Sequence, residues 1–120
     1  MRYLSTRTPE HRVSLSEALQ QGLAPDGGLY VPESFPTFEP DDFDGCDTPE
    51  AIAERLLTPF FVGDELEPVL PEVCAAMYGF AVPLKDVGAD TAVLELFHGP
   101  TAAFKDVGAR FLASTLSHLN

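Results

Sequence analysis

The sequence predicts an α+β fold, mostly helical with short strands, over residues 1–90, followed by a strand, a loop and a helix over residues 91–120. In two stretches the apolar residues recur at the spacing of a helix, and each stretch follows a residue that can cap the start of a helix. After Gly79 the apolar residues gather instead in short runs flanked by glycine and proline. Eleven prolines and nine glycines mark many turns, so the elements must be short. A chain of 120 residues is at most one small domain or a piece of a larger one.

The composition argues against several classes of protein. A net charge of −12, with only seven basic residues, argues against a nucleic-acid partner. No apolar run approaches the roughly 20 residues that span a bilayer, and the first residues lack the apolar core of a secretory signal, so we expect no membrane attachment. Cys46 and Cys74 form no metal-binding spacing with the three histidines. The sequence also permits a disulfide between the two cysteines, but we favour two free thiols in a cytoplasmic protein without a metal.

The N-terminal segment predicts a strand and then a helix. Tyr3–Thr6 suits a short edge strand. Ser14 can cap a helix in a capping box with Glu17, and Gly22 closes that helix. The buried side of the helix is expected to hold Leu15, Ala18 and Leu19.

A turn and a brief strand are predicted next. Pro25–Gly28 is a run of turn residues, and Leu29–Val31 suits a strand that Pro32 ends. A double glycine can also cradle a phosphate group, but the longer glycine spacing of such loops is absent, so we favour a tight turn.

An acidic, irregular segment, Pro36–Thr48, leads into the first long helix. Its aspartates, Asp41, Asp42 and Asp44, could bind a cation, but the ligand spacing of a calcium loop is absent and we favour a surface loop. Thr48 then caps a helix that has Pro49 in its first position and ends at Gly63. Its helical spacing comes from Ala51, Ile52, Arg55, Leu56, Leu57, Phe60 and Phe61.

A further helix and two strands follow. The helix, over residues 64–79, is expected to bend or restart near Pro71 and to stop at Gly79. Residues 81–87 and 91–97 suit two strands around a turn at residues 88–90.

The last helix is expected to run from Ala102 or Phe104 toward Leu119. At about 100° per residue, one continuous arc of this helix holds Phe104, Val107, Phe111, Leu112, Thr115, Leu116 and Leu119. Asp106 and Arg110 fall on the other side, as an exposed pair four residues apart. We expect the arc to be left uncovered by this chain, so that the helix frays or self-associates in isolation.

Lys105 is one of two lysines in the chain, and it does not join the polar side of this helix. It is expected to project between Leu112 and Leu116. Apolar neighbours and the positive end of the helix dipole both disfavour an ammonium ion, and a neutral amine is what a Schiff-base lysine requires. Alternatively, Lys105 covers apolar surface with its stem while its amine reaches water. Spacing alone leaves both interpretations open.

The residues before Lys105 have alternatives of their own. His98 could be an acid, a base or a phosphate donor, but we favour a local hydrogen bond. Thr101 could cap the last helix. The stretch from Gly99 to Lys105 faintly resembles a nucleotide-binding P-loop, but it lacks the Gly-Lys-Ser/Thr ending, so we reject that interpretation.

The stretch "LELFHGPTAAFKDVGARFLA" resembles the lysine segment of the threonine synthase family, whose core reads H-G-P-T-x-A-F-K-D. That core is here His98–Asp106, without a gap. "YLSTR" and "SLSEALQQGLAPDGGLYVPE" resemble the start of the same family. Several matching segments in the correct order are far more specific than a lone lysine motif.

The resemblance implies that Lys105 is both catalytic and cofactor-binding, holding pyridoxal 5'-phosphate as a Schiff base. The implied reaction converts O-phospho-L-homoserine and water to L-threonine and phosphate. Residues 1–90 would be the family's N-terminal domain, and residues 91–120 the start of an α/β fold-type II catalytic domain. In this family the groups that hold the cofactor phosphate and ring lie farther along the chain. The implied partners are therefore the small-molecule substrate and the remainder of the catalytic domain.

Two functions follow from this resemblance. In the first, the chain is the N-terminal part of a threonine synthase and is inactive by itself. In the second, it is a non-catalytic module of the same descent that serves packing or partner binding. The intact lysine core favours the first, and the missing cofactor cradle favours the second.

Overall fold

The computed structural model describes residues 1–120, and its first element is a small antiparallel sheet. The sheet contains β1 (Tyr3–Ser5), β2 (Arg12–Val13) and β3 (Tyr30–Pro32) in the order β2-β1-β3. Tyr3 pairs with Val13 on one side and with Pro32 on the other. The expectation of an edge strand at residues 3–6 is therefore wrong, because the strands on either side of the first helix both return to pair with β1.

The first helix, α1 (Leu15–Gln21), confirms the predicted cap and stop. The Glu17 amide donates to Ser14 Oγ at 3.1 Å, and the Ser14 amide donates to Glu17 Oε2 at 2.8 Å, so the capping box is complete. Gly22 follows with a φ of 73°, which ends the helix. Leu15 and Ala18 are buried.

The double glycine forms the predicted tight turn. The Gly28 amide donates to Asp26 Oδ1 at 2.8 Å. The Ser5 hydroxyl donates to the other oxygen of this carboxylate, Oδ2, at 2.7 Å. A Cβ on Gly28 would collide with Ser5 Oγ, so only glycine fits against β1 there. Hydrogen bonds from the Thr8 side chain, the Gly28 amide and Ser5 lower the pKa of Asp26 to about 2.

The acidic segment lies on the surface and includes a short 3₁₀ helix, η1 (Pro40–Phe43). Its three aspartates are exposed, and no group of three metal-ligating side chains forms there. The next helix, α2 (Pro49–Phe61), starts as predicted, because the Ala51 amide donates to Thr48 Oγ1 at 3.2 Å. Of the residues that give its helical spacing, Phe61 faces the core together with Ala53, whereas Ile52 and Leu56 are exposed.

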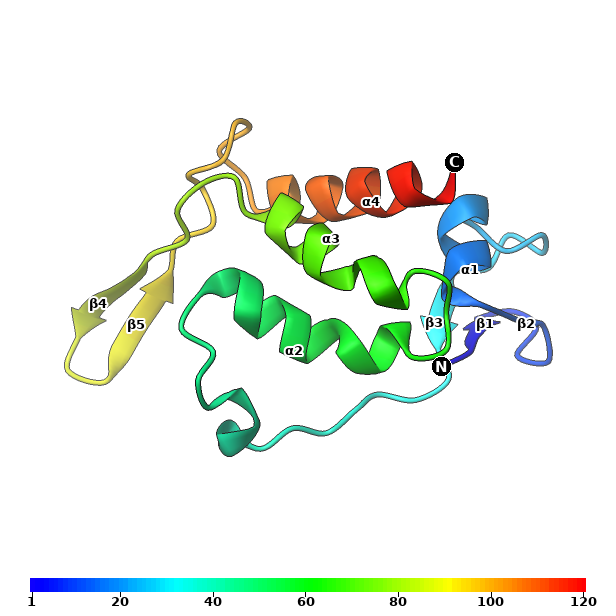
Figure 1. The fold of residues 1–120 in the computed structure, drawn as a ribbon, viewed down its shortest axis with the longest axis horizontal. Helices are drawn as coiled ribbons and strands as arrows, with labels where there is room; N and C mark the ends of the chain where they lie inside the picture. The colour runs from blue at the N-terminus through cyan, green and yellow to red at the C-terminus, as the bar shows by residue number, and fades with distance from the viewer.

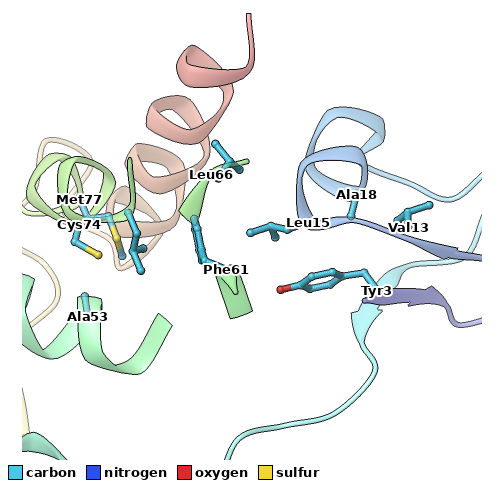
Figure 2. Packing of buried hydrophobic residues seen from close by; sticks show 10 residues of the cluster. Tyr3, Val13, Leu15, Ala18, Ala53, Phe61, Leu66, Cys74 and Met77 are labelled. Atoms are coloured by element: carbon cyan, nitrogen blue, oxygen red, sulfur yellow. The ribbon is translucent and has the colours of Figure 1, made fainter. Parts of the chain in front are cut away.

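The restart predicted near Pro71 is confirmed. A 3₁₀ turn, η2 (Glu67–Val69), leads into α3 (Leu70–Met77), which has Pro71 in its first turn. The core lies between α2, α3, α1 and the sheet, as Figure 2 shows. It contains Tyr3, Val13, Leu15, Ala18, Ala53, Phe61, Leu66, Leu70, Cys74 and Met77.

The two cysteines are free thiols, as favoured from the sequence: Cys74 is buried in the core and Cys46 is half-buried. Burial, followed by the charge of Glu54, raises the pKa of the Cys74 thiol to about 11. None of the helices has both the length and the apolar character that crossing a bilayer requires.

The last three elements are a hairpin and a helix. The strands β4 (Leu84–Gly88) and β5 (Thr91–Leu94) pair antiparallel around the predicted turn, with an irregularity between Asp86 and Gly88. All their residues are exposed, and Figure 1 shows the hairpin extending away from the helices. The final helix, α4 (Lys105–Leu119), lies along α3, and its C-terminal end reaches α1.

Candidate functional site

Lys105 is the first residue of α4 and is exposed to solvent. None of the three ion pairs in the chain involves it. The residue before it, Phe104, occupies the cap position and supplies no side-chain hydrogen bond. The amine of Lys105 is therefore accessible at the positive end of a fifteen-residue helix.

The apolar side chains expected to surround Lys105 do not cover it in this chain. Phe104 is 73% exposed and Leu112 is 42% exposed, so the expectation that Lys105 is shielded between Leu112 and Leu116 is wrong here. The reason is the rotation of the helix. Val107, Phe111 and Leu119 pack against the core, and Thr115 is fully buried.

This rotation also corrects the expectation that the arc is left uncovered. Its inner half is covered by α1 and α3 of the same chain, and Phe111 meets Phe61 edge-on with ring centroids 6.1 Å apart. The outer half, with Phe104 and Leu112, remains exposed. The prediction of fraying or self-association in isolation therefore concerns that outer half.

Asp106 does not form the predicted exposed pair with Arg110. Asp106 is only 7% exposed, and its Oδ2 accepts a hydrogen bond from the Thr101 amide at 3.1 Å. The guanidinium of Arg110 turns toward α3 instead: Nε donates to the Ala76 carbonyl at 2.9 Å, and the group lies 5.8 Å from the centre of the Phe80 ring. Contacts with other parts of the chain therefore keep Asp106 and Arg110 from forming the pair that their helical spacing predicted.

The loop between β5 and α4 folds back on itself just before Lys105. The Ala102 amide donates to the Gly99 carbonyl at 3.0 Å, and the Val107 amide donates to the Phe104 carbonyl at 3.1 Å. Ala102 has a φ of 54°, and it is the one residue other than glycine with a positive φ. Such a backbone costs about 1 kcal/mol or more, so the contacts around it must hold it in place.

His98 and Thr101 have local roles. His98 Nε2 lies 2.8 Å from Glu95 Oε1, which confirms the favoured local hydrogen bond. Thr101 does not cap α4, as the sequence left possible, because Phe104 occupies the cap position and Thr101 contributes its amide to Asp106. Sequence reasoning missed this contact, although an aspartate in the first turn of a helix is a known acceptor of backbone amides.

An apolar groove of about 630 Å³ lies beside the first turn of α4. Its walls come from the start of α2, the end of α3, the hairpin and α4, and they include Ile52, Tyr78, Val82, Leu84, Leu94, Leu96, Phe104 and Val107. Lys105 does not line it. The groove therefore includes the Phe104 side chain but not the neighbouring Lys105.

Comparison with known proteins gives a consistent result. A family model described as "Threonine synthase N terminus" matches residues 2–78. The chain is 39% identical to a threonine synthase of Pseudomonas aeruginosa over 127 residues, which cover 99% of this chain and 27% of that protein. It also resembles the crystal structure of threonine synthase from Escherichia coli, with a TM-score of 0.88 and 33% identity over 99% of this chain and 28% of that one.

A second solved structure is described as PLP-bound threonine synthase from Brucella melitensis. It superimposes with a TM-score of 0.73 and 37% identity, again over 99% of this chain and 28% of that chain. The chain thus spans a little over a quarter of the length of the relatives it matches.

Proposed function

This chain belongs to the threonine synthase family, and we propose that it forms the N-terminal part of a threonine synthase, which converts O-phospho-L-homoserine and water to L-threonine and phosphate. Residues 1–90 would form the N-terminal domain, and residues 91–120 would begin a catalytic domain of the α/β fold-type II class. The family matches, which cover nearly all of this chain and a quarter of its relatives, support this assignment.

The observation that carries the proposal is the presentation of Lys105. Its amine is exposed and unpaired in the first turn of α4, directly after a loop that is held in a strained conformation. The only other lysine, Lys85, lies in the exposed hairpin strand β4 without such a loop before it. A lysine at the end of a fixed loop suits catalysis, because the same amine must approach the same reacting carbon atom in every reaction cycle.

Pyridoxal 5'-phosphate fits this site through one group. A primary amine without an ion-pair partner can bond covalently to the aldehyde of the cofactor, and Lys105 offers such an amine. When bound, the cofactor supplies an electron sink for negative charge that develops on the substrate. The groups that hold its phosphate and its ring are expected beyond residue 120.

The part of Lys105 in the reaction is that of a base. In its free form, Lys105 Nζ is expected to move protons at Cα and Cβ of the substrate. The exposed Phe104 and Leu112 supply apolar surface that the rest of the catalytic domain would cover, excluding water from the amine.

A non-catalytic module that serves packing or partner binding is the second candidate, and the apolar groove beside α4, which Lys105 does not line, is the observation that favours it. The two candidates differ in what the full-length protein does. A threonine synthase releases phosphate from O-phospho-L-homoserine, whereas a packing module leaves the substrate unchanged.

Phosphate release therefore tests the proposal. The full-length protein, supplied with pyridoxal phosphate and O-phospho-L-homoserine, is expected to release phosphate and form threonine. The Lys105→Ala variant should lose this turnover with its fold intact, because replacing an exposed side chain changes stability by about 0.5 kcal/mol or less. The Lys85→Ala variant is the matched control and should keep it.

Residues 1–120 alone should release no phosphate. Turnover by the isolated chain would contradict the proposal that the groups holding the cofactor lie beyond residue 120. Full activity of Lys105→Ala would contradict the proposed role of Lys105.

A further inference from the structure

We propose that Asp106 is a positioning residue, whose carboxylate holds the backbone of Gly99–Thr101 against the first turn of α4 and thereby sets the approach to Lys105. The inference rests on the proposed function, since it concerns access to the amine that is expected to react. It assigns to Asp106 a contact with the loop, and no contact with substrate.

Two contacts join the carboxylate to the loop. The Thr101 amide donates to Asp106 Oδ2 at 3.1 Å. A Cβ on Gly99 would lie 2.6 Å from Oδ2 and 3.0 Å from Cβ of Asp106, so the Gly99 backbone rests directly on the side chain. No larger residue fits at position 99 without moving one of the two. The loop is therefore held by both a hydrogen bond and close packing.

The burial of Asp106 has no other explanation among its neighbours. A carboxylate that leaves water needs a charged partner or hydrogen bonds. No ion pair includes Asp106, and Arg110, four residues later on the same helix, donates to the Ala76 carbonyl instead. What remains is the Thr101 amide together with the positive end of α4, which favours an anion in the first turn.

The position of Asp106 couples this contact to the reactive residue. Asp106 directly follows Lys105 in the first turn of α4, and its own amide donates to the Ala103 carbonyl at 3.2 Å. The strained Ala102 lies between the held segment and the lysine. Releasing the carboxylate would let the loop relax and change the path by which an aldehyde or a substrate reaches Lys105 Nζ. It also follows that the Thr101 amide is structural and does not donate to a ligand.

Four variants of the full-length protein separate the features of this contact. Asp106→Ala removes the acceptor. Asp106→Glu keeps the charge but adds a methylene where Gly99 already touches the side chain. Asp106→Asn keeps the size and an acceptor oxygen. Asp86→Asn, in the exposed strand β4, is the control for loss of one negative charge.

Two measurements on these variants do not depend on turnover. The first is hydrogen exchange of the Thr101 amide, which should be about 10- to 100-fold faster in Asp106→Ala, as expected for loss of a hydrogen bond to a charged acceptor. The second is the rate at which pyridoxal phosphate and borohydride label Lys105, which should fall roughly tenfold or more when the approach is misplaced. Asp106→Glu should behave like Asp106→Ala, and Asp106→Asn should recover most of both values.

Steady-state kinetics give a third readout. If Asp106 sets geometry rather than binding, kcat should fall by about 10- to 100-fold in Asp106→Ala with a smaller change in KM. Asp106→Glu gives the same information if Asp106→Ala does not fold, because it keeps the charge at the start of α4.

The outcomes separate this inference from the proposed function. If wild-type protein is labelled at Lys105 and the Ala and Glu variants are labelled at the same rate, the positioning role is wrong and the proposed function stands. Unchanged exchange of the Thr101 amide in both variants contradicts the contact itself. If wild-type Lys105 is never labelled, the proposed function fails and this inference fails with it.

Discussion

The two parts of the chain differ in how they hold their shape. The sheet, α1, α2 and α3 enclose a core of apolar side chains, among which Phe61, Leu66 and Val73 are almost fully buried. Every residue of the hairpin β4–β5 is exposed, and the two buried residues of α4 are polar, Asp106 and Thr115. One part is held by its own apolar core, and the other mainly by hydrogen bonds and by the packing of one side of α4.

Lys105 lies in the second part, the hairpin and α4, which has no apolar core of its own. The loop before it is held by backbone hydrogen bonds and by Asp106, while Phe104 and Phe97 remain largely exposed. This chain thus holds the backbone that carries Lys105, and the proposed remainder of the catalytic domain would provide the apolar environment of its amine.

The largest expected effect contrasts one phenylalanine from each part. Phe61 is 1% exposed, so Phe61→Ala should reduce the free energy of unfolding by about 3–5 kcal/mol. Within residues 1–120, Phe104→Ala should change it by about 0.5 kcal/mol or less, because that ring is largely exposed in this chain. Chemical denaturation of both variants measures the difference. Similar losses in the two variants would break the distinction between the parts.

A partly buried polar contact within the first part should have the next largest effect. Asp64 accepts hydrogen bonds from the Ser16 amide at 3.0 Å, from the Leu66 amide at 2.9 Å and from the Ser16 hydroxyl. Asp64→Ala leaves these donors unpaired at the junction of α1 and α2, which should cost about 2–3 kcal/mol. The matched control is Glu65→Ala, at the neighbouring exposed position. A cost no greater than that of the control would show that the junction is solvated.

Alkaline pH should weaken the first part selectively. Burial, and to a smaller extent the charge of Asp64, raises the pKa of Tyr3 from 10.0 to about 12. The folded state therefore holds this proton more tightly than the unfolded state, so its contribution is complete below pH 10 and is lost as the pH rises toward 12. The unfolding free energy of Tyr3→Phe should fall less steeply over that range, although the variant also lacks the hydrogen bond to the Phe60 carbonyl. Parallel pH curves for the two proteins would contradict this.

The smallest expected effect tests a helix cap. Ser14→Ala removes the acceptor for the Glu17 amide and should cost about 1 kcal/mol. Ser14→Asp restores an acceptor and should recover most of the loss in the same denaturation experiment. An Asp variant no more stable than the Ala variant would show that the cap contributes little.

The elements that the sequence predicts well are those decided by neighbouring residues. The caps at Ser14 and Thr48, the restart at Pro71 and the hairpin turn at residues 88–90 all depend on groups within four positions of one another. Short-range chemistry of this kind can be deduced from residue type and spacing. The same holds for His98, whose partner, Glu95, lies three residues away.

The features that were predicted wrongly depend on distant neighbours. Residues 3–5 are a central strand because residues 30–32 return to them. Arg110 leaves Asp106 because α3 presents the Ala76 carbonyl, and α4 turns its Phe111 side inward, where that ring meets Phe61. Spacing along one helix gives the relative angles of its side chains but not which angle faces the core. The role of Lys105 itself came from the family resemblance, and it remains a proposal.

The most direct test of the central claim is to identify the lysine that carries the cofactor. The full-length protein is incubated with pyridoxal phosphate, reduced with borohydride, digested, and its pyridoxyl peptide is sequenced. We predict a single modified residue, Lys105, and no label in the Lys105→Ala variant. A label only on Lys85, or no label in this chain at all, would contradict the claim that this loop and helix present the reactive amine.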